Sequence, residues 1–326
     1  MKKKPKQQEY TYAVARIRFK ETKLLSDADL ASLLAAKDTD AVMRLLRDKG
    51  WGDNADHRPE ELLAIEEKKL WDFVAESVDD LSTLNFLLVH HDFHNLKVAV
   101  KCITRDSKPD GLWIGNAVED PEKLYRALKS REYGELPDYL REPAKEAMSA
   151  ILQTSDGQLC DLIIDKACME YVYHLGHEDD NEIIRLYCEL FVASSDIKIA
   201  LRSARTHKKL DFIRRSMAAC DTLDVEKLSL AAVEGEDAVL TYLGTTEYRA
   251  AVDALGVSMS AFEKWCDDYL TAVMKPQKWE PFGIGPIVAY IIARQNELKA
   301  VRMILSAKVN NLSESTIKER LRSMYV

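Results

Sequence analysis

The apolar positions of this chain recur at the three- and four-residue intervals of amphipathic helices. Tyr10, Ala13, Val14 and Ile17 share one face of a helix predicted over residues 10–21. Ser26 precedes a second helix in the manner of a capping residue, because its hydroxyl can accept an orphan backbone N–H. The same pattern predicts helices near residues 42–49, 59–74, 82–104, 159–175, 182–205 and 286–305, and a short one after Ser313.

Proline and glycine mark where these helices should begin and end. Pro121 suits a first helical turn, and Pro137 and Pro143 are expected to break the following stretch into short helices. Residues 107–111 have the composition of a turn and predict a first domain boundary, and residues 206–209 predict a second.

Three similar segments recur at an even spacing. They begin at Asn95, Asp196 and Glu297, which are 101 residues apart, and each places a large aliphatic residue and then a lysine after the polar residue. Solenoid repeats usually recur every ~20–50 residues, so this longer period predicts three whole helical modules. We expect a flexible basic tail over residues 1–9 and modules over residues 10–108, 109–209 and 210–326, the last including a C-terminal helix.

Composition supports an all-α fold. The 326 residues include only 12 glycines and 9 prolines, and Leu, Ala, Glu, Lys and Arg, all good helix formers, are abundant. Alternating strand-like runs are scarce. The predicted class is therefore all-α, with three similar helical modules.

The net charge and the cysteine pattern indicate which partners and which cellular compartment to expect. A net charge of −8 is unlike the basic excess of nucleic-acid-binding proteins, so we expect no nucleic-acid partner. The basic run of Lys2, Lys3, Lys4 and Lys6 is expected to be a solvated tail, and contact with anionic lipid is the lesser alternative. Polar residues follow this run where a signal peptide would have an apolar stretch, so we expect no signal peptide. Six scattered cysteines indicate a reduced compartment. The longest uncharged run, residues 281–293, is short of the ~20 apolar residues that span a bilayer.

Motifs for catalysis, cofactors or metals are missing from the sequence. It has no phosphate-binding P-loop, and the glycines at 283 and 285 before Pro286 indicate a turn that leads into a helix. His90 and His94 share a helix face at a spacing used by zinc helices, but without the acidic residue of that motif they are interpreted as surface histidines. We expect no catalytic residue, no bound cofactor and no metal site.

Several segments resemble a known family. The opening YTYAVARIRFKETKLLS, the following LLAAKDTDAVMRLLRDKGW and the closing IVAYIIARQNELKAVRMILSAKVNNLSE are similar to the C subunit of bacterial and archaeal V/A-type rotary ATPases. The eukaryotic counterpart is the d subunit of the vacuolar proton pump. The resemblance extends from about Tyr10 to the end of the chain.

The resemblance implies a mechanical role without catalysis. It implies three helical domains in a pseudo-threefold funnel with a central hollow, peripheral to the cytoplasmic face of a membrane. Its implied partners are the central axle subunits of the soluble ATP-handling head and the membrane proteolipid ring. The protein would serve as a central-stalk rotor socket for proton or sodium transport, with no direct membrane span.

The repeated segments supply the candidate interface residues. One interpretation places Lys97, Lys198 and Lys299, with their polar companions Asn95, Asp196 and Glu297, at partner surfaces. The alternative, which we favour, is that the aliphatic members form equivalent cores while the polar ones solvate helix faces. Exposed charge pairs contribute only ~0–1 kcal/mol each.

Two other classes of protein stay open at this point. An α-helical repeat adaptor outside the rotary ATPases would also explain the missing chemistry, and it would form an open superhelix instead of a closed ring of modules. A metal-dependent helical enzyme using His90 and His94 is the second alternative.

Overall fold

The computed structural model describes residues 10–53 and 57–326, and this part of the chain is all-α. The predicted tail over residues 1–9 lies outside the described residues. None of the described residues lies in a strand. The α-helices are α1 (Thr11–Glu21), α2 (Asp27–Ala35), α3 (Thr39–Asp48), α4 (Pro59–Ala75), α5 (Val89–Thr104), α6 (Pro121–Ser130), α7 (Asp138–Thr154), α8 (Gly157–His177), α9 (Glu182–Arg205), α10 (Leu210–Ser216), α11 (Val225–Glu234), α12 (Glu236–Leu243), α13 (Val252–Val257), α14 (Met259–Met274), α15 (Gly285–Val309) and α16 (Glu314–Lys318). Short 3₁₀ segments are η2 (Leu81–Leu87), η3 (Tyr133–Glu135), η4 (Glu247–Ala251) and η5 (Lys275–Trp279).

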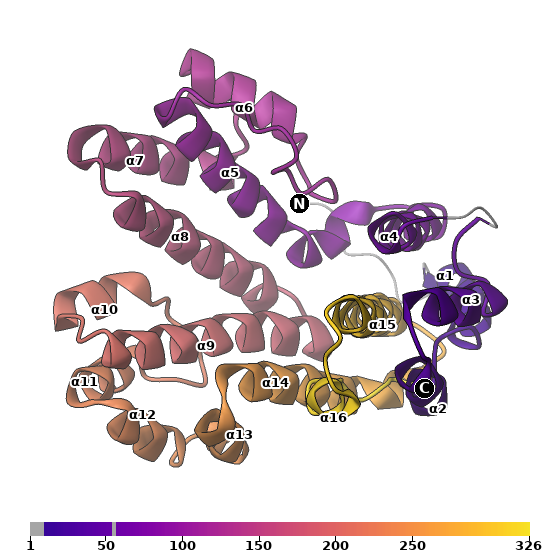
Figure 1. Ribbon diagram of the computed structural model, residues 1–326. Helices are drawn as coiled ribbons and strands as arrows, with labels where there is room; N and C mark the ends of the chain where they lie inside the picture. The colour runs from indigo at the N-terminus through magenta and orange to yellow at the C-terminus, as the bar shows by residue number, and fades with distance from the viewer. Residues whose placement is uncertain (1–9, 54–56) are drawn as a thin grey trace. The chain divides into compact units, whose positions relative to one another are not determined.

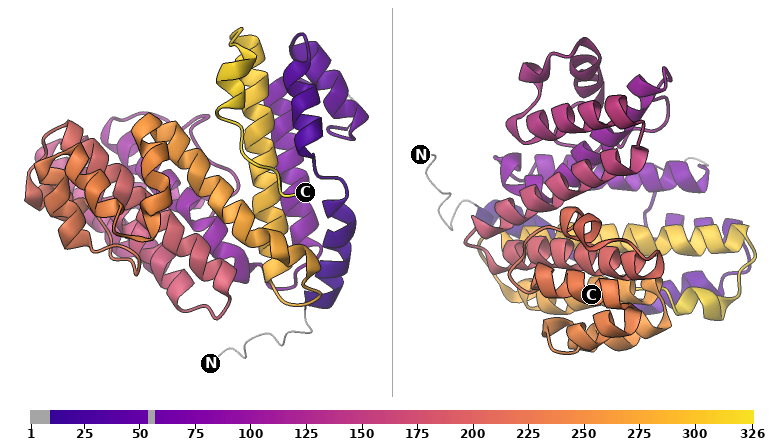
Figure 2. Two further views of the ribbon diagram at one scale, coloured as in Figure 1. Left: turned by 90° about the horizontal axis from the view of Figure 1, so that it is seen from below. Right: turned by 90° about the vertical axis from the view of Figure 1, so that its left-hand side faces the viewer.

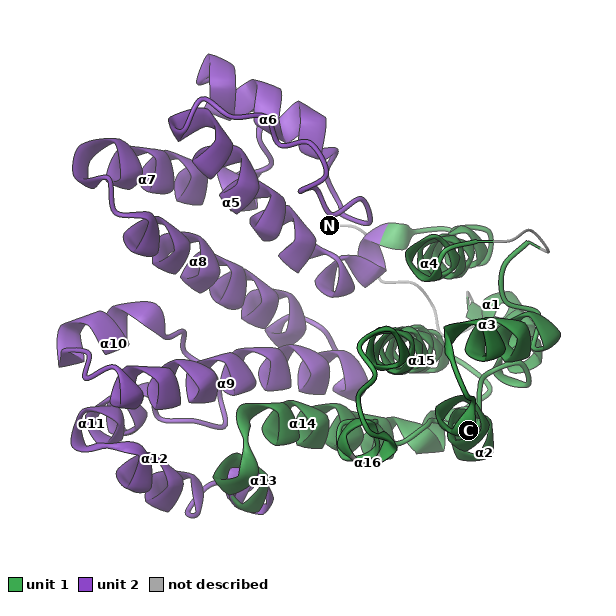
Figure 3. Cartoon of the chain, in the orientation of Figure 1, with its two compact units in different colours: residues 1–81, 253–326 green, residues 82–252 purple. Residues whose placement is uncertain are grey.

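The chain divides into two compact units (Figure 3). Unit 1 combines both ends of the chain, residues 1–81 and 253–326, and unit 2 contains residues 82–252. These limits fall inside the first and third predicted modules. The division into three modules at residues 109 and 210 stays a prediction.

Unit 1 is built around the long C-terminal helix α15 (Figure 1). Figure 2 shows α15, in yellow, alongside helices of the N-terminal segment, and it packs against α1, α2, α3 and α4 as well as α14. Val301, Ile304 and Leu305 of α15 join Leu46 and Leu62 in one buried cluster. Apolar burial is the main favourable term in folding. The apolar cluster between α15 and the N-terminal helices therefore holds the two ends of the chain together.

Unit 2 is built around helices α8 and α9, which pack against each other and against helices from both sides of the sequence. Helix α8 packs against α7 and α9, α5 packs against α6, α7 and α8, and α11 covers part of α9. Met169, Val192 and Ala218 form a buried cluster between α8, α9 and the segment that follows α10.

Helix starts agree with the sequence prediction where a capping residue or proline is present. Ser26 forms a capping box with Asp29, Pro59 and Pro121 occupy first turns, and α9 has the predicted limits. The glycines at 283 and 285 form the predicted turn, with Gly283 at φ 81° and α15 starting at Gly285.

Two predicted boundaries were wrong. Residues 82–104 do not form one helix, because η2 comes first and α5 begins only at Val89. Pro143 does not end a helix but lies inside α7. A proline in a helix removes one backbone hydrogen bond, and the buried face of α7, which includes Leu140, Ala144 and Ala147, continues past it.

Helices α8 and α9 approach closely at Gly176, which predicts a strong effect of substitution there. A Cβ added at Gly176 would overlap Cys188 Cβ. We expect Gly176→Ala to lower the free energy of unfolding by about 2 kcal/mol. The energetic cost of forcing a methyl group into a packed core is larger than the gain from alanine's higher helix propensity. Gly157→Ala, in the first turn of the same helix with open space around it, is the matched control. Equal stability of the two variants in urea unfolding would contradict the prediction.

Candidate partner-binding site

The three polar residues of the 101-residue repeat occupy similar positions on three long helices. Asn95 lies on α5, Asp196 on α9 and Glu297 on α15. Their side chains are at most 1% exposed, and the aliphatic residue after each is buried as well. Our preferred interpretation placed these polar residues on solvent-exposed helix faces, and this was wrong. Asn95, Asp196 and Glu297 are buried in the helix packing.

Each buried polar side chain accepts a backbone N–H from a loop. The donors are Ile114 N to Asn95 Oδ1 at 2.9 Å, Ala218 N to Asp196 Oδ1 at 3.2 Å and Leu25 N to Glu297 Oε1 at 2.5 Å. Asn95 also donates to the Ile114 carbonyl oxygen at 3.0 Å. Buried backbone N–H groups need partners, so these side chains fix the three loops to the long helices.

The loops hold equivalent places in the fold. Ile114 precedes α6, Ala218 precedes α11 and Leu25 precedes α2. In the first two cases the loop comes 19 and 22 residues after the side chain that holds it, with α10 between α9 and Ala218, whereas in the third the loop comes from the opposite end of the chain, 272 residues away. The N-terminal segment thus supplies the loop that completes the repeat around α15.

The three lysines remain closer to solvent. Lys97 Nζ lies 2.6 Å from Asp165 Oδ1 on α8, and Lys299 Nζ lies 3.5 Å from Asp267 Oδ1 on α14. Lys198 is half-buried on α9. Contact of the three lysines and of Asn95, Asp196 and Glu297 with a partner stays a prediction. The last three side chains are buried within this chain.

Burial alters the acid–base behaviour of the loop anchors. It raises the pKa of Asp196 to about 8, against a smaller opposing effect of the Ala218 N–H bond. Burial likewise raises the pKa of Glu297. One turn before Asn95, burial raises the pKa of Asp92 to about 6, although Tyr139 Oη donates to Asp92 at 2.7 Å.

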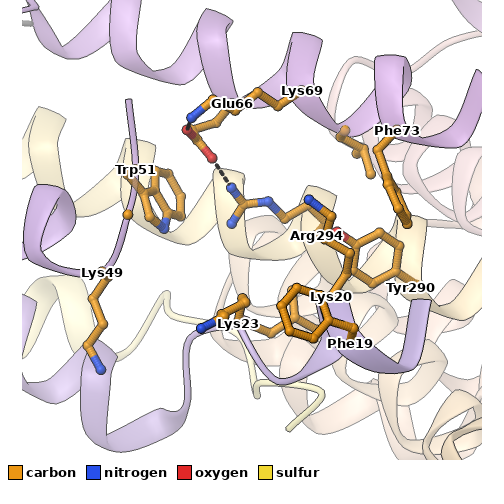
Figure 4. Close-up of a pocket in the computed structure, with 13 residues that line it drawn as sticks. Phe19, Lys20, Lys23, Lys49, Trp51, Glu66, Lys69, Phe73, Tyr290 and Arg294 are labelled. Atoms are coloured by element: carbon orange, nitrogen blue, oxygen red, sulfur yellow. Dashed lines mark hydrogen bonds and ion pairs between the residues drawn. The ribbon is translucent and has the colours of Figure 1, made fainter. Parts of the chain in front are cut away.

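The third anchor, Glu297, belongs to a buried ionic cluster with Arg294 and Glu66, and Figure 4 shows the Glu66–Arg294 pair. Arg294 Nη2 donates to Glu66 Oε2, and Arg294 Nη1 donates to Glu297 Oε2. Glu66 also accepts from Gly52 N at 2.8 Å and Lys69 Nζ at 2.7 Å. Sequence reasoning missed this cluster, since Glu66 is 228 residues from Arg294; only the i,i+3 spacing of Arg294 and Glu297 was visible.

Exposed aromatic side chains gather on α1 and on the segment before α15. Tyr12 and Phe19 are 66% and 65% exposed and lie seven residues apart on one face of α1, while Trp279 and Phe282 are 85% and 50% exposed. Arg18 Nη2 donates to the Gln277 and Glu280 carbonyl oxygens at 2.7 and 2.5 Å, which ties α1 to this segment. We call Tyr12, Phe19, Trp279 and Phe282 the aromatic set.

The described part of the chain offers neither a cluster of metal ligands nor a membrane-spanning helix. His90 and His94 are half-buried on α5, and within residues 10–53 and 57–326 no three His, Cys, Asp or Glu side chains converge as metal ligands. Among the same residues, no helix has both the length and the apolarity required to cross a bilayer.

The described residues form an all-helical structure in which three long helices carry buried polar anchors. The family model of the ATP synthase (C/AC39) subunit matches residues 13–320. The chain belongs to this family, whose members are non-catalytic structural subunits of rotary ATPases.

Relatives that match over most of their length agree with the family match. The chain is 24% identical to the C subunit of the V-type sodium ATPase of Enterococcus hirae, over 95% of this chain and 97% of the relative. It is 25% identical to the C subunit of the A-type ATP synthase of Methanocaldococcus jannaschii, over 97% of this chain and 86% of the relative. The resemblance inferred from the sequence is confirmed.

Proposed function

We propose that this chain is the central-stalk rotor subunit of a V/A-type ATPase, a socket between the central axle and the membrane proteolipid ring. In this proposal it transmits torque for proton or sodium transport and is held at the cytoplasmic face through the complex. The observation that carries the proposal is the family match over nearly the whole chain.

The internal repeat supports this proposal over an open helical adaptor. Three long helices each hold a loop through one buried polar residue, and the third loop is supplied by the opposite end of the chain. Such a closing contact joins the last repeat to the first segment, which is the connectivity a ring of modules requires. An open superhelix instead leaves its two ends as separate capping repeats.

Reconstitution tests the proposal directly. Purified chain should form a stable complex with axle subunits of a V/A-type ATPase from the same source, and this complex should associate with the detergent-solubilised proteolipid ring. Binding of neither partner would reject the socket role. Binding of the axle without the ring would limit the role to an axle adaptor.

The aromatic set is the proposed anchor for one of these partners. Interface energy is concentrated in a few Trp, Tyr and Arg side chains, and Trp279 is the most exposed large apolar residue described. We expect the double variant W279A/F282A to weaken partner binding about 10- to 100-fold, since hot-spot truncation costs roughly 2 kcal/mol or more.

The control for this prediction is Leu152→Ala, which removes an apolar side chain that is 56% exposed on α7. Both variants should keep the wild-type circular dichroism, because the side chains removed are exposed. Equal affinities of W279A/F282A and wild type, measured by biolayer interferometry against axle and ring, would show that Trp279 and Phe282 do not anchor either partner.

A further inference from the structure

A basic pocket of about 440 Å³ lies within unit 1 (Figure 4). Helices α1, α4 and α15 and the segments that follow α1 and α3 form its walls. Its lining includes five cationic side chains and one carboxylate, Glu66; the cations are Lys20, Lys23, Lys49, Lys69 and Arg294. Such a concentration of positive charge contrasts with the net charge of −8 of the whole chain.

Among the described residues, two of the five cations have no carboxylate to neutralise them. Lys49 Nζ pairs with Asp29 at 2.6 Å, and Lys69 and Arg294 share Glu66. Lys20 and Lys23 instead lie over aromatic rings, 4.9 Å from the Phe73 centroid and 5.8 Å from the Phe19 centroid. Within residues 10–53 and 57–326, neither lysine forms an ion pair with an acidic side chain.

Ion pairs and a ring contact hold Arg294, one of the lining side chains. The Arg294 guanidinium lies between Glu66 and Glu297 and 4.3 Å from the Trp51 ring centroid. Trp51 and Tyr290, which are 3% and 5% exposed, both line the pocket, and the Trp51 ring gives the cation an apolar neighbour. Electrostatic interactions are stronger beside apolar surface than in bulk water, so an anion that enters the pocket would be attracted by Lys20 and Lys23, which have no acidic partner among the described residues.

We propose that this pocket binds a multiply charged phosphate group. Cationic side chains from α1, α4, α15 and the segments that follow α1 and α3 line the pocket, and a phosphate group offers several acceptor oxygens and more than one negative charge to them. A single carboxylate offers only two oxygens. The volume lies in the range of small-ligand sites, which extend from about 300 to 1,000 Å³. The phosphate belongs either to a soluble polyphosphate compound or to a phospholipid headgroup.

Binding of inorganic tripolyphosphate to the full-length chain tests the proposal. Isothermal titration calorimetry should show one site, with an affinity that falls as salt rises. K20Q/K23Q should weaken binding about tenfold or more, because each lost charge-assisted hydrogen bond contributes strongly to affinity. K20R/K23R keeps both charges and should bind nearly as well as wild type.

The matched control is K129Q/K208Q. Lys129 and Lys208 lie over Tyr125 and Phe212 at 5.8 and 4.8 Å, in arrangements like those of the two pocket lysines but outside the pocket. This variant should bind tripolyphosphate as wild type does. Circular dichroism checks that all variants are folded.

Two further titrations identify the phosphate source and the alternative ligand. Stronger binding to vesicles of phosphatidylcholine with phosphatidic acid, whose phosphomonoester can carry two negative charges, than to tripolyphosphate, again lost in K20Q/K23Q, would support the proposal and assign a lipid headgroup. No binding of either probe to wild type, equal binding by K20Q/K23Q, or tighter binding of a polyglutamate peptide would overturn it. These measurements use the isolated chain, so their outcome does not depend on assembly with axle or ring.

Discussion

Replacing Arg294 by methionine is expected to lower the free energy of unfolding of unit 1 by about 3–5 kcal/mol. Arg294 is 9% exposed and lies between two carboxylates that are themselves 4% and 0% exposed, those of Glu66 and Glu297. Methionine keeps much of the apolar stem but removes the positive charge that both carboxylates share. The loss is large because two buried acids then face each other without this cation between them.

A second substitution, at Glu297, should restore part of the stability lost in R294M. This rescue distinguishes the effect of the unpaired charge from the effect of altered packing. Glu297→Gln removes one of the stranded charges while the amide oxygen can still accept the Leu25 N–H. R294M/E297Q should therefore be more stable than R294M alone, a non-additivity that a double-mutant cycle measures. If the double variant is instead less stable by the sum of the two single effects, the ionic cluster is not the cause.

Urea unfolding followed by tryptophan fluorescence is a suitable measurement for these variants. Trp51 lies against Arg294 and reports on this region. Arg302→Met, on the exposed side of the same helix, is the matched control and should change stability by less than about 0.5 kcal/mol.

Asp196→Asn is expected to remove much of the decline in stability of the wild-type chain between pH 4 and pH 8. Asp196 is fully buried on α9, and within the described residues only its Oδ1 has a hydrogen-bond donor, Ala218 N. Lys166 attracts the ionised carboxylate and Glu189 repels it, but the loss of hydration dominates and raises the pKa to about 8.

The sign of the effect follows from this raised pKa. In the unfolded chain Asp196 loses its proton near its ordinary pKa of 3.8, whereas in the folded chain it keeps the proton up to about pH 8. Unfolding between these values therefore releases a proton, and stability falls by about 1.4 kcal/mol per pH unit from this group. Asparagine does not titrate, and the equivalent residue of α5, Asn95, already is one.

Denaturation at several pH values checks this prediction. The wild-type chain should lose stability as pH rises from 4 to 8, and D196N should show a slope smaller by about one proton. Asp92 and Glu297 also have raised pKa values, so D196N should retain part of the slope. Asp110→Asn, at an exposed turn residue, should leave the slope unchanged. Identical slopes for D196N and wild type would show that Asp196 is ionised in the folded chain.

The sequence predicted the helices because their signals are local. Apolar spacing of three and four residues, the Ser26 cap and the prolines at 59 and 121 each act within one or two turns. The family was also visible in the sequence, since its characteristic segments are continuous stretches. At Pro143 the buried face of α7 continues past the proline, so packing outweighed a local preference; nothing in the structure explains why residues 81–87 are 3₁₀ and not α-helical.

The repeat at Asn95, Asp196 and Glu297 shows the limit of such inference. Its period was determined by the sequence alone, and with it the expectation that these residues are equivalent. Whether they face solvent, a partner or the core depends on what packs over them. The tertiary structure decided that each is buried and holds a loop, the third from the opposite end of the chain.

Thus the amino-acid sequence by itself determined the all-α class, the limits of several helices, the spacing of the repeat and the resemblance to the family. Only the tertiary structure decided the ionic cluster of Glu66, Arg294 and Glu297 and the basic pocket above it. The physical reason is the range of the interactions. Helix formation depends on neighbours three and four residues away, whereas burial of a charge depends on residues more than two hundred positions apart.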